Sequence, residues 1–326
     1  MASRVVGLDI GTSGVRAAEL TLGKGGATLE RFGQVALPPG AVRDGEVVDA
    51  YAVGEAIKQL WSQAKFSSKK VVVGVANQRV VVRQVDLPWM PTADLKKALA
   101  FQVQDFIPMP VEQAILDFHP LEEFTNDAGG RMIRVLLVAA AREMVGTALE
   151  AVEKAGLQPE MVDLTSFAVL RALVSMDHTG LSSFDAEAVV DIGASVTNII
   201  IHQGGVPRFV RILLMGGGDI TDALAERLGV PVEQAESVKQ ASGLSSVPGG
   251  VDSDPATRAI EATGSAFVEE VRGSLDYYMA QPGAVRIARV VVSGGGSRLA
   301  GLTDEQLAYV EPMVAVPVGL AMGVSS

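Results

Sequence analysis

The sequence contains one short pattern twice, and this repetition constrains the fold more than any other feature. An apolar run near the start ends in Asp-Ile-Gly-Thr-Ser at residues 9–13, and a later run ends in Asp-Ile-Gly-Ala-Ser at residues 191–195. Each is followed by a second apolar stretch, at residues 15–20 and 197–202. Apolar runs on both sides of a glycine turn predict a strand, a turn and a strand. We therefore expect two similar halves.

The segments around the two copies alternate between helix and strand patterns. Apolar residues recur on one helical face over residues 53–64, 144–155 and 260–278, and the apolar run at residues 287–293 has the length of a buried strand. This alternation predicts an α/β fold. Residues 81–157 follow the order strand, helix, strand, strand, helix, which predicts a module inserted between the two halves.

Composition and charge exclude several classes of protein. The chain has 326 residues, enough for two domains, and 48% of them are hydrophobic. It has no cysteine, and its three histidines, His119, His178 and His202, lie far apart. This excludes a disulfide framework, a cysteine nucleophile and a histidine-rich metal site. The net charge of −11 argues against a nucleic-acid binder, which needs a basic face.

No segment of the sequence predicts a membrane span or a secretion signal. The longest uninterrupted apolar run, residues 135–141, is far shorter than the roughly 18 residues that a spanning helix needs. An acidic residue, Asp9, follows the start before an apolar core of signal-peptide length is reached. We therefore expect a cytoplasmic protein that does not insert directly into a membrane.

The two glycine turns have the residues that a phosphate site requires. A glycine turn lets several backbone N–H groups point into one space, where they can bind phosphate oxygens. An aspartate at the tip of the preceding strand can organise Mg²⁺, which is usually held by one or two carboxylates together with phosphates and waters. A single turn of this kind is common in ordinary hairpins. Two turns that face each other would hold a triphosphate from both sides, with Asp9 and Asp191 at the metal.

Three further segments suit other parts of a nucleotide. Glycines 216–218 open a predicted helix, whose N–H groups and positive dipole end favour an anion. Glycines 294–296 end a predicted strand and allow a base or ribose to approach the backbone closely. Glu236 and Lys239, three residues apart on one predicted helix, could bind a ribose or form only a solvated ion pair. The P-loop and dinucleotide-binding patterns are both absent from the sequence.

These segments resemble, in order and along nearly the whole chain, the motifs of the actin-like ATPase superfamily. Residues 6–16 resemble its first phosphate motif, with Arg16 where a lysine is usual, and residues 189–201 resemble the second. Residues 161–172 resemble its first connecting helix, and residues 290–302 its adenosine motif. The resemblance implies that ATP binds with Mg²⁺ in a cleft between two domains.

Within this superfamily the chain is most similar to the PilM family, an actin-like component of type IV pilus assembly. Residues 87–118, 155–168 and 208–239 carry this resemblance. It implies duplicated actin-like (ribonuclease H-like) domains with an inserted subdomain of the kind that FtsA and PilM share. The implied bounds are 1–80 and 158–187 for the first domain core (1A), 81–157 for the inserted subdomain (1C), and 188–326 for the second domain (2A, with 2B at about 228–285).

The family resemblance also implies a place in the cell and a set of partners. The chain would be a cytoplasmic scaffold, recruited to the inner face of the cell membrane through a partner. That partner is the cytoplasmic N-terminal tail of a PilN-like membrane protein, bound on the inserted subdomain, and other pilus platform proteins are further partners. A homo-oligomer is left open. No Lys or Arg follows Arg298, unlike the basic amphipathic helix that ends FtsA-like proteins.

The expected nucleotide-binding residues come from both turns, the two further glycine segments and the predicted Glu236–Lys239 helix. They are Asp9, Gly11, Thr12, Ser13, Gly14, Arg16, Asp191, Gly193, Ala194, Ser195, Gly216, Gly217, Gly218, Glu236, Lys239, Gly294, Gly295, Gly296 and Ser297. Asp9 and Asp191 are the expected metal ligands, and Arg16 is expected to neutralise phosphate charge.

Hydrolysis of the nucleotide is expected to be slow or absent. Fast hydrolysis needs a polar side chain that orients water at the γ-phosphate. The resemblance places Phe167 near that position, with Asp163, Thr165 and Ser166 as the nearby polar candidates. Two alternatives stay open. One is an FtsA-like filament-forming protein, and the other is a small-metabolite kinase of the same superfamily, which would need a carboxylate base near the γ-phosphate.

Overall fold

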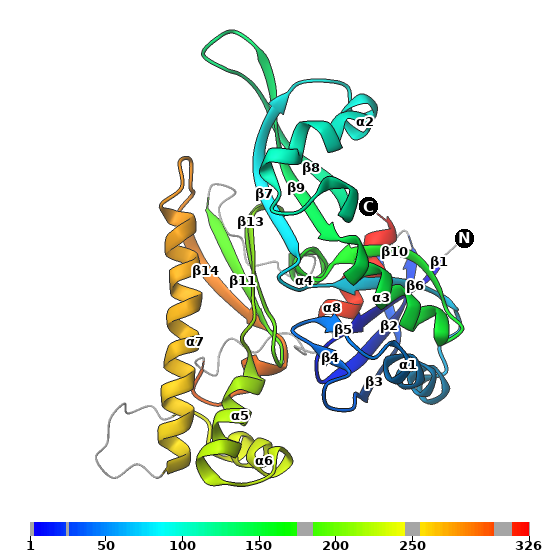
Figure 1. The fold of residues 1–326 in the computed structure, drawn as a ribbon, viewed down its shortest axis with the longest axis vertical. Helices are drawn as coiled ribbons and strands as arrows, with labels where there is room; N and C mark the ends of the chain where they lie inside the picture. The colour runs from blue at the N-terminus through cyan, green and yellow to red at the C-terminus, as the bar shows by residue number, and fades with distance from the viewer. Residues whose placement is uncertain (1–2, 24–25, 175–184, 245–254, 303–314, 326) are drawn as a thin grey trace.

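The computed structural model describes residues 3–23, 26–174, 185–244, 255–302 and 315–325. It has two lobes, and a smaller module projects from the first lobe (Figure 1). Each lobe is built on one mixed sheet, and the module on a third, antiparallel sheet. Helices accompany all three sheets, so the predicted α/β class is confirmed.

The sheets of the two lobes share one plan. The first contains β1 (Ser3–Ile10), β2 (Gly14–Gly23), β3 (Gly26–Ala36), β6 (Lys70–Val75) and β10 (Gln158–Leu164), in the order β10-β6-β1-β2-β3. The second contains β11 (Ala186–Ile192), β12 (Thr197–Gln203), β13 (Val206–Leu213) and β14 (Ile287–Ser293), in the order β13-β12-β11-β14. In each, the first strand pairs antiparallel with the next strand and parallel with a later one. This shared plan confirms the predicted duplication.

Helix α1 (Ala50–Ala64) covers one face of the first sheet together with α3 (Arg142–Lys154). The carboxylate of Asp49 caps α1 by accepting hydrogen bonds from two backbone N–H groups of its first turn. Val152 on α3 is fully buried in the same core as Ile57 on α1. Helix α3 therefore packs on the first lobe, although the predicted inserted subdomain extended to residue 157. This packing favours an end of the inserted module at β9 (Arg131–Ala141).

Helices α4 (Thr165–Val174) and α8 (Ala315–Met322) pack together on the other face of the first sheet. A Cβ atom on Gly7 of β1 would stand 2.0 Å from the carbonyl oxygen of Pro317, so glycine is what allows α8 to approach the strand. The predicted second domain contains all residues from 188 onward, whereas α8 packs on the first sheet. The connecting helix predicted from residue 161 begins at Thr165, because the preceding residues form β10.

The inserted module is a three-stranded antiparallel sheet in the order β7-β9-β8, with α2 packed on one face. Leu87, Leu95 and Leu137 are buried between sheet and helix. The turn between β8 and β9 closes with a hydrogen bond from the N–H of Asn126 to the carbonyl oxygen of Gly130 at 3.0 Å. The elements are β7 (Val80–Pro88), α2 (Thr92–Val103), η1 (Gln104–Phe106), η2 (Val111–Gln113), β8 (Ala114–Thr125) and β9 (Arg131–Ala141).

The long helix α7 (Pro255–Met279) lies along the sheet of the second lobe, and α5 and α6 lie at one end of that sheet (Figure 1). Phe267 of α7 is buried against residues of β11 and β12. Within the described ranges, no helix is both long enough and apolar enough to cross a membrane. The remaining elements are the short strands β4 (Val42–Arg43) and β5 (Glu46–Val47), helices α5 (Gly217–Leu228) and α6 (Val232–Ser242), and turns η3 (Gly295–Arg298) and η5 (Gly323–Ser325).

Candidate functional site

A cleft of about 1020 Å³ is lined by residues of both lobes. Both glycine turns reach it, as do α5, α6 and the segment after β14. Four of the predicted site residues do not line the cleft, namely Gly14, Ser195, Gly216 and Ser297. The predicted residues that line it are Asp9, Gly11, Thr12, Ser13, Arg16, Asp191, Gly193, Ala194, Gly217, Gly218, Glu236, Lys239, Gly294, Gly295 and Gly296.

The two turns are closed by equivalent hydrogen bonds. The N–H of Gly11 donates to the carbonyl oxygen of Gly14 at 3.0 Å, and the N–H of Gly193 donates to that of Val196 at 2.9 Å. A Cβ atom on Gly193 would stand 2.6 Å from the Val196 oxygen, closer than non-bonded atoms approach, so this turn requires glycine. The repeated pattern in the sequence therefore corresponds to a repeated backbone geometry at one cleft.

Asp9 at the end of β1 forms an ion pair with Arg16 on β2. The two residues are directly opposite in the hairpin register, and Oδ2 of Asp9 lies 3.3 Å from Nη1 of Arg16. Burial raises the pKa of Asp9, and the positive charge of Arg16 counteracts part of that rise. Arg16 thus neutralises a carboxylate in this structure and lies where it could also meet a phosphate group.

Asp191 occupies the equivalent position at the end of β11, and it is only 5% exposed. Its Oδ1 atom is buried and has no hydrogen-bond partner among the described residues. Burial, followed by the negative charge of Asp9, raises the pKa of Asp191 to about 7, against the opposing hydrogen bonds of Ser293 and Asn198 and the charge of Arg16. Asp9 and Asp191 therefore share one electrostatic environment.

A divalent cation fits this pair of carboxylates. An unpartnered buried oxygen on Asp191 and a second carboxylate facing the same cleft are hard oxygen donors of the type that Mg²⁺ prefers. No group of three or more His, Cys, Asp or Glu side chains suited to a metal occurs in the described ranges. A cation here would consequently take its remaining ligands from water and from the bound molecule.

Glycines 216–218 hold the second turn in place. The N–H groups of Gly217 and Gly218 donate to the carbonyl oxygens of Gly193 and Ala194 at 2.9 and 2.7 Å. The N–H of Gly216 donates to the Asp219 carboxylate at 2.7 Å. The sequence predicted either an anion site at these N–H groups or a loop in which Asp219 caps the helix, and in this structure each of the groups has a protein acceptor.

Glu236 and Lys239 on α6 form a compact polar network with Thr221 on α5. Lys239 Nζ lies 2.7 Å from Glu236 Oε2 and donates to the Thr221 hydroxyl and the Gly217 carbonyl, each at 2.8 Å. The Lys239 side chain is only 13% exposed. Burial alone would raise the pKa of Glu236, but hydrogen bonds from Lys239, Thr221 and Gln240 lower it overall. The Glu236 side chain is 40% exposed, so the pair is solvated at its Glu236 end, and both predicted roles stay open.

The glycines after β14 differ in role. Gly294 has a φ of +81°, and a Cβ atom there would stand 2.3 Å from the carbonyl oxygen of Ile192. A Cβ on Gly296 would stand 2.4 Å from the Ile192 side chain. Gly295 has no atom within 4 Å of such a Cβ, so it faces open space. Ser297 directs its hydroxyl to the Gly294 carbonyl at 2.8 Å, which accounts for its place outside the cleft.

Several residues that line the cleft were not predicted, among them Thr165, Asn198, Thr221 and Arg298. Asn198 lies opposite Asp191 in the second hairpin, as Arg16 lies opposite Asp9 in the first. A longer alignment of the two repeats would have identified Asn198.

The candidates for orienting water differ in their surroundings. Asp163 is ion-paired with Arg171, and the Ser166 hydroxyl donates to Asn198 Oδ1 at 3.0 Å. Phe167 packs against buried apolar residues. Among the predicted candidates, only Thr165 lines the cleft. Its neutral hydroxyl is a weak base and would remove a proton from water poorly.

The chain is similar in sequence to FtsA proteins, over a length that differs from one FtsA protein to another. The chain is 26% identical to cell division protein FtsA of Bacillus subtilis over 73% of its own length, and it covers 58% of that relative. It is 25% identical to FtsA of Neisseria meningitidis over 95% of its length, and covers 82% of that protein. The chain thus spans little more than half of the Bacillus subtilis relative.

Solved structures agree with the duplicated architecture. The structure of MreB5 of Spiroplasma citri bound to ADP superposes with a TM-score of 0.55 at 12% identity, covering 99% of this chain and 98% of that one, which shows an actin-like fold. A chain of the PilM-PilN type IV pilus biogenesis complex superposes with a TM-score of 0.83 at 28% identity, over 99% of this chain and 98% of that one. The family model described as type IV pilus assembly protein PilM matches residues 7–320. The chain therefore belongs to the PilM family of actin-like type IV pilus assembly proteins.

Proposed function

We propose that this protein is an ATP-binding scaffold of the type IV pilus assembly platform. The observation that carries the nucleotide part is the convergence of two equivalent glycine turns, with Asp9 and Asp191, on one cleft. A volume of about 1020 Å³ is at the upper end of the range of roughly 300–1,000 Å³ that is typical of small-molecule sites. The cleft is therefore large enough for a nucleotide.

The parts of ATP are matched to different walls of the cleft. The triphosphate lies between the turns at residues 11–14 and 193–195, where backbone N–H groups and the Arg16 guanidinium are its donors. The adenosine lies toward α6, where Glu236 and Lys239 are the polar groups for its ribose. Gly295 leaves open space in that direction. Glycines 216–218 support the second turn and contact the phosphates only through it.

Asp9 and Asp191 would hold Mg²⁺ beside the triphosphate. The ion would supply positive charge that neutralises the phosphate oxygens and the two carboxylates together. Arg16 pairs with Asp9 in the structure described here. A bound metal would take over the Asp9 charge and leave the guanidinium to the phosphates.

We assign the protein slow or no ATP hydrolysis. Asp163, the carboxylate among the predicted candidates, is ion-paired with Arg171. Thr165 reaches the cleft but has no charge with which to activate water. The ion pair of Asp163 also counts against the small-metabolite kinase, because a kinase needs a free carboxylate base near the γ-phosphate.

The partner part of the proposal places the cytoplasmic tail of a PilN-like membrane protein on the inserted module. Support comes from the solved PilM-PilN complex, which contains the structure that this chain matches at a TM-score of 0.83. The module also exposes large apolar side chains, with Phe101 77% and Phe106 38% exposed. Binding of this tail, with other pilus platform proteins, would recruit the cytoplasmic protein to the inner face of the membrane.

Calorimetry tests both parts separately. ATP is titrated into the protein with Mg²⁺ or with a chelator, and a synthetic PilN-like tail peptide is titrated in a second experiment. Saturable binding of Mg·ATP is expected, with ADP release slower than one turnover per minute in a coupled assay. Absence of ATP binding at millimolar concentration would reject the nucleotide part, and absence of peptide binding would reject the partner part. ATP-dependent light scattering would instead favour the filament-forming alternative.

A further inference from the structure

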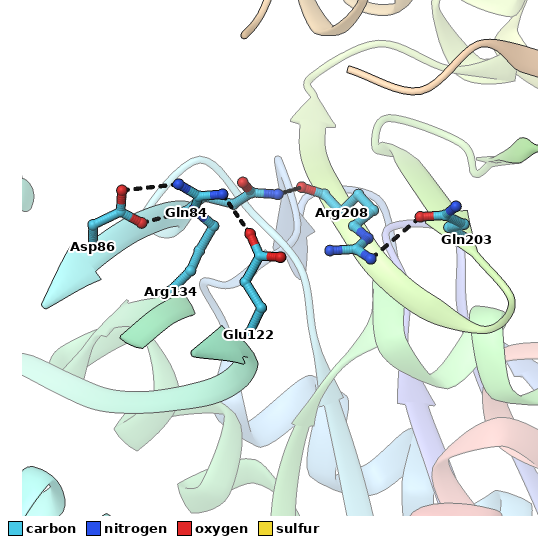
Figure 2. A network of polar contacts seen from close by, with 6 residues as sticks. All are labelled: Gln84, Asp86, Glu122, Arg134, Gln203 and Arg208. Atoms are coloured by element: carbon cyan, nitrogen blue, oxygen red, sulfur yellow. Dashed lines mark hydrogen bonds and ion pairs between the residues drawn. The ribbon is translucent and has the colours of Figure 1, made fainter. Parts of the chain in front are cut away.

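The inserted module touches the second lobe directly, although the chain connects it to the first lobe. Strand β7 of the module lies against β13, an edge strand of the second sheet. At the outer end of this contact, Nε2 of Gln84 donates a hydrogen bond to the backbone carbonyl oxygen of Arg208 at 2.6 Å. Figure 2 shows that this bond runs from the module to the second lobe. The two parts therefore have a polar contact in addition to their apolar packing.

Apolar side chains continue the contact from Gln84 toward the cleft. Val82 and Val210 belong to one apolar cluster, and Val80 and Ile212 belong to another. This grouping of alternate residues of β7 with alternate residues of β13, together with the Gln84 hydrogen bond, indicates an antiparallel order of the two strands. Because successive side chains of a strand point to opposite faces, a single face of β7 supplies all of these contacts.

Both strands lead from this contact to the walls of the cleft. Ala76, shortly before β7, lines the cleft, and so do Gly217 and Gly218, shortly after β13. A change in the angle between the lobes would therefore slide β7 along β13. Gln84 lies about 13 Å farther from the cleft than Val80, at about 3.3 Å for each residue of a strand. Any relative movement of the two strands would displace the Gln84 hydrogen bond, because this bond joins them directly.

On the module, Gln84 lies beside an ion-pair network that joins all three strands. Arg134 on β9 donates to both carboxylate oxygens of Asp86 on β7, at 2.7 and 3.0 Å, and it also donates to Glu122 on β8. The register places Arg134 directly opposite both acidic residues. Figure 2 shows this network next to Gln84. A displacement of β7 would therefore be passed to β8 and β9.

We propose that the hydrogen bond from Gln84 to the Arg208 carbonyl couples occupancy of the cleft to the conformation of the inserted module. This rests on the proposed function, since the nucleotide is the ligand that would change the angle between the lobes. Ligands shift a conformation only through different affinities for its two states. The effect is reciprocal, so a peptide on the module changes nucleotide affinity by the same factor as nucleotide changes peptide affinity.

Hydrogen exchange of the full chain tests the coupling, with Gln84→Ala as the variant and Arg83→Ala as the matched control. Arg83 is the exposed neighbour of Gln84 and its side chain points to the opposite face of β7. Without nucleotide, amides of residues 206–213 and 80–88 should exchange roughly three- to tenfold faster in Gln84→Ala than in Arg83→Ala. Mg·ATP should change exchange in residues 114–141 of the wild type and Arg83→Ala, and at least about threefold less in Gln84→Ala.

The affinity for a fluorescent ATP analogue, measured on the same samples, separates this proposal from the proposed function. Gln84 does not line the cleft, so Gln84→Ala should still bind the analogue saturably, with an affinity shifted by no more than the factor that the coupling itself contributes. Equal exchange in the two variants without nucleotide, or an undiminished response to Mg·ATP in Gln84→Ala, would overturn the coupling. If no variant binds the nucleotide, the proposed function fails and coupling to the cleft fails with it. The exchange of the nucleotide-free variants then still decides whether the contact joins the two parts.

Discussion

Gly319 of α8 lies directly against the backbone of Ala168 in α4, because a Cβ atom on Gly319 would stand 1.7 Å from the Ala168 carbonyl oxygen. The two helices can pack on the first sheet only at this separation. Gly319→Ala should therefore force them apart and lower the free energy of unfolding by about 3 kcal/mol or more. Urea denaturation followed by circular dichroism measures the change.

Gly146→Ala is the control for that substitution. Gly146 is an exposed residue within α3, and a Cβ atom there meets no atom within 4 Å. Alanine is favoured over glycine inside a helix by about 0.8–1.0 kcal/mol, so Gly146→Ala should raise the free energy of unfolding by roughly that amount. Equal effects of the two substitutions would contradict the proposed close packing of α4 and α8.

The raised pKa of Asp191 makes the stability of the nucleotide-free protein depend on pH. An aspartate carboxyl in the unfolded chain has a pKa of about 3.8, and burial raises the pKa of Asp191 to about 7 in the folded protein, so between these pH values the folded state binds the extra proton. Stability from this group is therefore full below pH 4 and declines as pH rises toward 7, by roughly 4 kcal/mol at most. Asp191→Asn should remove much of this decline. Denaturation at pH 5 and pH 8, without divalent ions, compares the two proteins, and identical pH dependence would refute the assignment.

Asp9→Asn should change ATP binding in opposite directions with and without metal. With Mg²⁺, loss of a ligand should weaken binding about tenfold or more. With a chelator, the substitution removes a negative charge from the site and releases Arg16 from its ion pair, so ATP should bind as tightly as to the wild type or more tightly. Calorimetry under both conditions measures this. Equal weakening in both would show that Asp9 has only a structural role.

The ribose assignment can be tested with Glu236→Gln. The wild type should bind ATP more tightly than 2′,3′-dideoxy-ATP, and the substitution should reduce this preference by about threefold to tenfold. Thr221→Val is a useful companion, because it removes the hydroxyl that bonds Glu236 and Lys239 and leaves both of those side chains in place. If Thr221→Val and Glu236→Gln reduce the preference equally, the network would act only by positioning α6. Competition against a fluorescent ATP analogue gives both affinities.

The repeated pattern was enough to predict the duplicated sheets and the position of both aspartates. These hairpins could be predicted because each one, a strand, a glycine turn and a second strand, is formed by residues adjacent along the chain. The order of elements in the inserted module was also predictable, from the alternation of strand and helix periods over residues 81–157.

Packing between distant segments was not predictable in the same way. Helix α3 follows the module in sequence but packs on α1, and α8 follows the second lobe but packs on the first sheet. Periodicity identifies which face of a helix is apolar and leaves its neighbour unspecified. The same reason applies to Gly217 and Gly218, because their acceptors, Gly193 and Ala194, lie 24 residues earlier in the chain.

Helix α8 also sets the order in which the protein can be completed during synthesis. The strands of the first sheet leave the ribosome early and α4 covers part of one face, yet the rest of that face is covered only after residues 315–322 have been translated. Until then the nascent chain presents an apolar surface that invites aggregation or chaperone capture. A stalled or truncated transcript should thus yield an insoluble product even when the entire first sheet has been made.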